Sequence, residues 1–240
     1  MAGRIGMIGI AVLSAALASG APARPEEPSH ASATGKGSSA SATAGPAETS
    51  SALAPPVPHV TASGTSGIEA LLSQGTQAVR RGALPEAITR IEAALDLARD
   101  RAPLEARRFL LVQEEPPGFG QYLPRSSNVF SPGEEMLFYL EPVNYTFQRK
   151  GDLYEAWLKV DVNLLLPDGT VIYGKRNFFE QVFSARSKIH DLYLNLSLEV
   201  SGLDEGVYRV EYVVKDGFSG KERAVHKDVV VREPEPVLNP

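Results

Sequence analysis

The chain has 240 residues and contains no cysteine. This absence excludes disulfide bonds, a thiol nucleophile and any zinc site built on cysteine. It also excludes the lipid-modified cysteine that anchors a bacterial lipoprotein. Secreted eukaryotic domains of this size usually carry disulfides, so the composition favours a bacterial envelope as the destination of an exported chain.

An excess of charge of one sign and long hydrophobic runs are also missing. The chain has 24 Lys and Arg against 29 Asp and Glu, a net charge of −5. It therefore lacks the basic face that a nucleic-acid partner requires. The apolar run from Ile5 to Ala18 is shorter than the roughly 20 residues that cross a bilayer. We expect no nucleic-acid partner and no membrane span in the processed chain.

The N-terminus has the three parts of a secretory signal peptide. Arg4 supplies a positive charge, the apolar run follows, and Ala21-Pro22-Ala23 offers a small-residue cleavage site. We predict a signal peptide over residues 1–23 and export to the periplasm or the cell surface. An uncleaved N-terminal anchor is the alternative.

Residues 24–66 consist mostly of Ala, Ser, Thr, Gly and Pro, with few large apolar side chains. Such a segment buries too little apolar surface to offset the entropy of ordering, so it is predicted to be a disordered linker. Residues 234–240 are assigned to a C-terminal tail.

Residues 67–102 change character, because apolar side chains recur there at helical spacing. Gly82 interrupts the pattern, and Pro85 is suited to the first turn of a second helix. We predict an antiparallel helical hairpin.

The hairpin resembles a tetratricopeptide repeat. Its small residues match the small positions of that repeat in order and spacing, and they are Gly75, Ala78, Gly82, Ala87 and Ala94. Ile91 stands where the repeat usually has an aromatic residue, and Arg99 stands at the closing proline. The chain has one clear copy, whereas a self-standing solenoid needs about three. The peptide groove of that family is therefore not carried over, and the hairpin is expected to pack on the next domain or on a second copy of itself.

Residues 103–233 alternate apolar and polar side chains between turn signals, which predicts antiparallel strands. One inward row runs through alternate residues from Ala156 to Leu164, and another from Leu192 to Val200. Tyr193, Asn195 and Ser197 are expected to face solvent. The fold class predicted is therefore mainly β, an antiparallel immunoglobulin-like β-sandwich that follows a short α-helical hairpin and a disordered N-terminal tail.

The last part of this domain contains Gly220-Lys221, which invites comparison with a phosphate-binding loop. Gly217 and Gly220 are too close for that motif, and Glu222 stands where it needs Ser or Thr. The turn DGFSG between two alternating runs instead predicts a β-hairpin. This hairpin is similar to the final hairpin of immunoglobulin-like and fibronectin-like domains of exported bacterial proteins, a resemblance that implies a fold and no activity.

The segment KRNFFEQVF places two aromatic residues side by side. Phe178 and Phe179 cannot both face one core from a regular strand, because successive side chains point to opposite faces. Either one of them covers the sheet edge or the strand is irregular there.

No spacing of His, Ser and acidic residues predicts a catalytic or metal site, so we expect no cofactor and a chain that is not an enzyme. The candidate binding residues are aromatic, clustered in sequence around one turn: Tyr145, Phe147, Tyr154 and Trp157. Alternation places Trp157, the only tryptophan, on the polar side of its strand. The first hypothesis is a non-catalytic interaction module whose β-sandwich presents an edge or the Trp157 face to a protein partner, which is another envelope protein or a second copy. The alternative is a carbohydrate-binding module that stacks sugar rings on these aromatics. A hydrolase with a dispersed site is the third reading, and a covered sheet face with Trp157 at its seam is the purely structural one.

Overall fold

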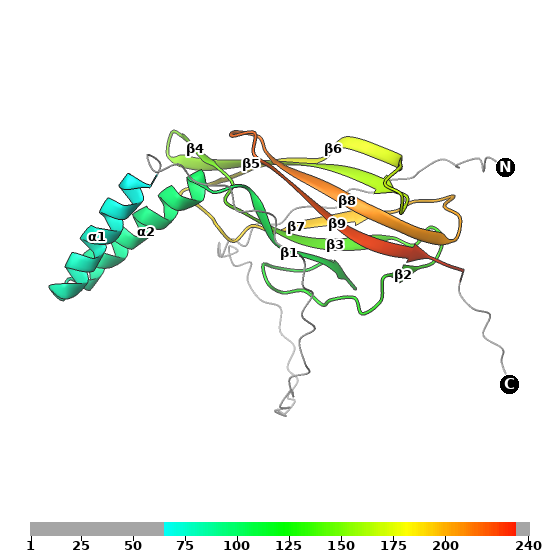
Figure 1. Cartoon of the computed structure of the whole chain (residues 1–240), viewed down its shortest axis with the longest axis horizontal. Helices are drawn as coiled ribbons and strands as arrows, with labels where there is room; N and C mark the ends of the chain where they lie inside the picture. Colours follow the sequence, from blue (N-terminus) through cyan, green and yellow to red (C-terminus); the bar gives the residue numbers. More distant parts are fainter. Residues whose placement is uncertain (1–64, 234–240) are drawn as a thin grey trace, which may run out of the picture. The chain divides into compact units, whose positions relative to one another are not determined.

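The structure is a computed structural model that describes residues 65–233. The predicted signal peptide, nearly all of the predicted linker and the predicted C-terminal tail lie outside the described residues. Gly67 and all later described residues belong to one compact unit. In it a pair of helices is followed by nine strands, so the described chain is mainly β (Figure 1). Neither helix is both long and apolar enough to cross a membrane.

The predicted helical hairpin is confirmed, with α1 at Ser66–Arg80 and α2 at Leu84–Arg101. Gly82 ends α1 in the left-handed conformation (φ 74°), and the Ala83 amide donates back to the Ala78 carbonyl at 2.9 Å. Pro85 lies in the first turn of α2, where its missing N–H costs little.

Small residues form the seam between the two helices. Gly75 and Ala78 of α1 and Ala87 and Ala94 of α2 are the buried residues of the hairpin. A Cβ atom added to Gly75 would lie 3.2 Å from Cγ1 of Ile91, so the helices approach closely there. The fully buried positions between the two helices are therefore occupied by small residues.

The strands form two sheets. A three-stranded sheet has the order β1-β3-β7. In a larger sheet β2, β9, β8 and β5 follow one another, and β4 pairs with the start of β5 on the same edge as β8. Strand β6 pairs with the opposite edge of β5. Their bounds are β1 Glu105–Val112, β2 Val129–Phe130, β3 Met136–Val143, β4 Phe147–Lys150, β5 Leu153–Leu165, β6 Val171–Ala185, β7 Leu194–Leu198, β8 Gly206–Asp216 and β9 Glu222–Val231. All pairings are antiparallel except the short one between β2 and β9.

One core fills the space between the two sheets. The predicted inward row of β5 is fully buried, and so is the row from Leu192 to Val200. The larger sheet is strongly curled into a half-barrel, with β1 of the smaller sheet close to β9 (Figure 1). The described chain is therefore mainly β, as predicted, but its curled sheet departs from the predicted immunoglobulin-like sandwich.

The prediction that Tyr193, Asn195 and Ser197 face solvent is wrong, because all three are buried. The connection between β1 and β2 folds over this face of the small sheet. Its Tyr122 packs on Tyr139 of β3, with ring centroids 4.6 Å apart, and the Asn195 amide donates to the Pro116 carbonyl at 3.2 Å. Alternation identifies the two faces of a strand, but it does not show which loop covers the second face.

Strand β6 is irregular where the two phenylalanines stand, as expected. Val160 pairs with Phe179 while Val162 pairs with Lys175, so β6 contains extra residues between these positions. Asn177 takes a positive φ of 50°, and its amide donates to Asp161 Oδ1 at 2.8 Å. This bulge turns both Phe178 and Phe179 into the core, where both are buried.

The last two strands confirm the predicted β-hairpin, and the buried carboxylate of Asp216 organises its turn. Asp216 Oδ1 accepts the Phe218 amide at 2.9 Å, and Oδ2 accepts the Ser219 hydroxyl at 2.6 Å. Oδ2 also accepts the Thr146 amide at 2.7 Å, just before β4 begins. Strands β4 and β8 lie one after the other along the same edge of β5, and Asp216 joins them.

Replacing this carboxylate tests its structural role. We expect Asp216→Ala to lower the free energy of unfolding by about 3 kcal/mol, because several charge-assisted hydrogen bonds lose their acceptor in a buried place. The matched control is Asp228→Ala in the same β-hairpin, whose ion pair with Arg209 is exposed to solvent and contributes little to stability. Urea unfolding of both variants measures the difference, and equal losses would contradict the assignment.

Candidate interaction surface

The structure separates the four aromatic residues that the sequence groups together. Tyr145, Phe147 and Tyr154 lie on the core side of the large sheet, near Ala156. Trp157 is on the opposite face of β5, next to Lys159 and Glu180. The four residues therefore do not form one surface, because neighbours in a strand alternate between its faces.

The three core-side aromatics pack beneath the segment that leads into β7. Tyr145 is buried, and its hydroxyl donates to the Ile189 carbonyl at 2.5 Å. Phe147 packs on Tyr145 and, edge to face, on His190. A cavity of ≈ 10 Å³ between Phe147 and Tyr154 has room for one water molecule at most. This cluster packs the sheet edge and leaves no space for a sugar ring.

Trp157 lies half-buried on the outer face, with its surroundings already filled. Its Nε1 donates to Glu180 Oε1 at 3.0 Å, and the Lys159 ammonium stands 3.9 Å from the ring centroid. Phe218 meets the ring edge to face, and a Cβ atom added to Gly217 would fall 2.3 Å from Cδ2 of Trp157. A sugar could stack on this indole only where it displaces one of these neighbours. Gly217 is thus required by the tryptophan, while Gly220 supplies the positive φ of the turn.

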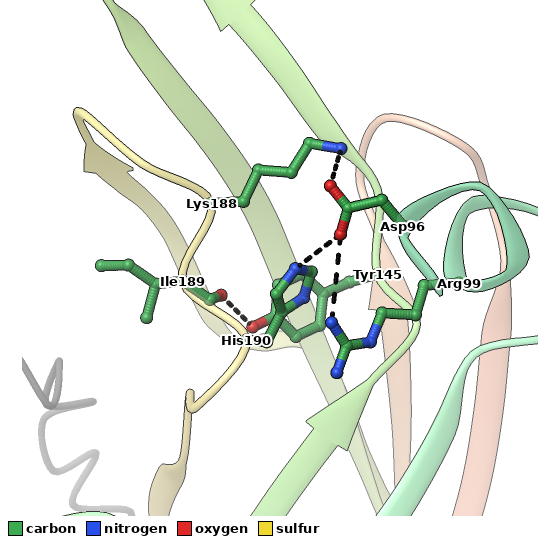
Figure 2. Close-up of polar contacts among 6 residues, drawn as sticks. All are labelled: Asp96, Arg99, Tyr145, Lys188, Ile189 and His190. Atoms are coloured by element: carbon green, nitrogen blue, oxygen red, sulfur yellow. Dashed lines mark hydrogen bonds and ion pairs between the residues drawn. The ribbon is translucent and has the colours of Figure 1, made fainter. Parts of the chain in front are cut away.

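A polar cluster joins helix α2 to the β domain (Figure 2). Asp96 of α2 accepts a hydrogen bond from Lys188 Nζ at 3.1 Å, and its Oδ1 lies 3.2 Å from His190 Nε2. Arg99, one turn further along α2, places Nη1 4.0 Å from the same carboxylate. Lys188 and His190 come from the segment that also covers Tyr145, so this segment contacts both the hairpin and the sheet.

Burial and the charges in this cluster together favour an ionised Asp96 and a neutral His190. Burial raises the pKa of Asp96, but the hydrogen bonds and charges of Lys188 and His190 outweigh it and hold the pKa below 3.8. Burial and the Arg99 charge lower the pKa of His190 below 6.5, against the opposing pull of Asp96. A neutral His190 contributes its full stabilisation above pH 6.5, and acid removes it as the pH falls through its folded pKa. Asp96 likewise contributes above pH 3.8 and loses its contribution below it.

A second contact reaches the end of α2 from the β8–β9 turn. Lys221 Nζ donates to the Asp100 carbonyl at 2.8 Å and to the Asn144 carbonyl at 3.1 Å. A lysine at a helix C-terminus satisfies free carbonyls and complements the helix dipole. The Gly-Lys pair of the turn therefore serves to hold a helix end and not a phosphate.

The hairpin carries the most concentrated exposed apolar surface of the described chain. Of the eleven large hydrophobic residues that are exposed in residues 65–233, six lie on α1 and α2, each 46–57% exposed. They are Leu72, Val79, Leu84, Ile88, Ile91 and Leu95. We call this set the apolar face of the hairpin.

Helix geometry gathers these side chains on one side. On α1, Val79 directly follows the seam residue Ala78; on α2, Ile88 follows Ala87 and Leu95 follows Ala94. The same step around two antiparallel helices leads to the same side of the pair. Leu84 and Ile91 continue the α2 stripe at spacings of four and three residues. The sequence signal for this face is the apolar residues at helical spacing beside the small ones.

Within residues 65–233, few side chains that could act together in catalysis or metal binding lie close to one another. No three His, Asp or Glu side chains there are placed to hold a metal ion. His190 contacts Asp96 and not its neighbour Asp191, a pairing that sequence distance concealed. A surface hollow of ≈ 340 Å³ beside β1 and β9 is lined in part by Arg125, whose guanidinium is bound to Glu134 and the Val129 carbonyl.

Comparison with known proteins adds no assignment. No family model matches the sequence, and no characterised protein is similar enough to be matched. Among solved structures, the chain is similar to an alkylpurine DNA glycosylase of Pseudomonas fluorescens, with 13% identity and a TM-score of 0.31 over 70% of this chain and 38% of that one. It is also similar to a Bacteroides uniformis β-glucuronidase, with 11% identity and a TM-score of 0.26 over 53% and 12% of the two chains. A family 123 glycoside hydrolase from Clostridium perfringens gives 9% identity and a TM-score of 0.26 over 55% and 27%. This chain thus spans well under half of each of these proteins, and similarities this low carry no functional argument.

The pKa shift of Asp96 leads to a pH-dependent prediction. We expect Asp96→Asn to lower the free energy of unfolding at neutral pH by less than about 1 kcal/mol, because the ion pair with Lys188 and the hydrogen bond with His190 are partly exposed. The difference in unfolding free energy between the variant and the parent chain should persist down to about pH 5. It should vanish as the pH falls through the folded pKa of Asp96, which lies below 3.8, because the protonated carboxyl group is then uncharged like the amide of Asn. Urea unfolding at several pH values measures it. A difference that stays constant through pH 3 would show that the charge of Asp96 is not what matters.

Proposed function

We propose that this chain is a non-catalytic, exported interaction module that binds a protein partner in the cell envelope through the apolar face of its helical hairpin. The observation that carries the proposal is the concentration of six exposed aliphatic side chains on one face of two helices. Contiguous exposed apolar surface on a soluble protein marks an interaction site. The β domain would act as the scaffold that holds this face.

The contacts at the end of α2 support that division of roles. Asp96 and Asp100 attach the last turns of α2 to Lys188, His190 and Lys221 of the β domain. These contacts use polar groups at one end of the hairpin and leave the apolar side chains exposed. A face held in this way is pre-organised, so less ordering entropy is lost on binding.

Carbohydrate binding is supported less well by the geometry. The aromatic residues that would stack a sugar lie on opposite faces of β5, and Trp157 already contacts Lys159, Glu180 and Phe218. Two finer points belong to the proposal as well: export by the predicted signal peptide, and a distant relation of the two facing sheets to the immunoglobulin-like sandwich.

Site-specific photo-crosslinking tests the proposal. We expect a photoreactive amino acid in place of Ile88 to form adducts with a protein in the cells that export the chain. The matched control is the same amino acid in place of Val171, which is 55% exposed against 57% for Ile88 but belongs to the β domain. Adducts at position 88 that exceed those at position 171 support the hairpin as the binding surface. Equal yields, or none at either position, would contradict it.

A further inference from the structure

The composition of the apolar face also indicates what binds it. Building on the proposed function, we infer that the occupant is a second copy of this chain, so that two hairpins pair face to face in a four-helix arrangement. Such a pairing is isologous: both copies contribute the same surface, so aliphatic side chains pack on aliphatic side chains.

The chemistry of the face fits itself. Its exposed large hydrophobic side chains are Leu, Ile and Val, with no aromatic ring among them. Thr76 lies between Leu72 and Val79 on α1, and its hydroxyl already donates to the Leu72 carbonyl at 3.0 Å. The face therefore presents no side-chain donor that needs a partner, and an aliphatic surface without polar demands is its best complement.

The charges around the face permit two copies to approach. Residues 66–101 hold five arginines and five carboxylates, so the hairpin has no net charge, whereas the whole chain has a net charge of −5. Two hairpins meet without net repulsion, and each offers both signs at its edges. Glu69 begins α1 and Arg80 ends it, while Glu86 begins α2 and Arg101 ends it.

The size of the face limits the area that the pairing can bury. Helix α2 has 18 residues and is about 27 Å long, so a face two helices wide offers roughly 500–600 Å² on each copy. Two copies would bury about 1,000–1,200 Å² in total, which is the lower end of specific interfaces. We therefore expect a dimer that dissociates on dilution in the micromolar range.

Sedimentation velocity of the exported chain, residues 24–240, from about 1 to 200 μM tests this inference, over a range set by the expected micromolar affinity. The parent chain should shift from monomer to dimer as its concentration rises. Ile88→Gln should remain monomeric with unchanged circular dichroism, because a polar group enters the centre of the interface. Val171→Gln, an equally exposed site on the β domain, should dimerise as the parent does.

The lack of native cysteine allows a second readout in the same experiment. A single Ile88→Cys chain treated with a bifunctional maleimide should give a covalent dimer, and a Val171→Cys chain should not. This readout does not depend on the stability of a polar variant. Crosslinking at position 171 equal to that at position 88 would show random collision and overturn the inference.

The remaining outcomes separate this inference from the proposed function. A parent chain that stays monomeric at all concentrations overturns self-association. If position 88 still gives photo-adducts of another mass, the proposed function survives with a different partner, and if it gives none, both fail. A chain that dimerises only after residues 24–64 are removed also overturns the inference, because those residues would then be the occupant.

Discussion

The seam between the two helices is the constraint on which this account rests. Glycine and alanine let α1 and α2 approach closely, because they fill the seam with small side chains. Six large aliphatic side chains of the hairpin lie beside the seam and are exposed on a common face, whereas Ile68, Leu71 and Leu97 are half-buried. Complete burial of one such side chain contributes about 1.5–3 kcal/mol of stabilisation. Six partly exposed side chains therefore leave stabilisation that is gained only when another surface covers them.

The β domain holds the hairpin but does not cover that face. Its attachments are polar and local: Asp96 with Lys188 and His190, and the Asp100 carbonyl with Lys221. Lys221 follows the turn that Asp216 organises, and Asp216 also holds the start of β4. The helix end, the β8–β9 turn and the edge of the large sheet are thus linked through a few charged groups. This linkage explains how a single hairpin keeps a defined place without a solenoid of repeats.

Local sequence patterns predicted the helices and strands of this fold well. They failed to predict contacts between segments that are distant in the sequence. Alternation identified the inward rows of β5 and β7, and Gly82 with Pro85 located the break between the helices. The adjacent Phe178 and Phe179 predicted either a covered sheet edge or an irregular strand, and β6 is irregular there. Alternation could not reveal that the β1–β2 connection covers Tyr193 and Asn195, because that depends on a loop about 80 residues away. The pairing of Asp96 with His190 spans 94 residues and left no mark in spacing. Grouping aromatics by sequence distance failed for Trp157, because one residue along a strand means the opposite face. The approach of β1 to β9 likewise joins distant segments, so no single segment predicts it.

The central claim is that the apolar face of the hairpin is open in the isolated chain and available to a partner. Carbene footprinting of residues 24–240 in dilute solution, read by mass spectrometry, tests it most directly. The account predicts that the peptides with Leu72, Val79, Ile88 and Leu95 are labelled about as strongly as the one with the exposed Val171. Protection of the hairpin peptides at a dilution where the chain is monomeric would contradict the claim, because the face would then be covered by the chain's own residues.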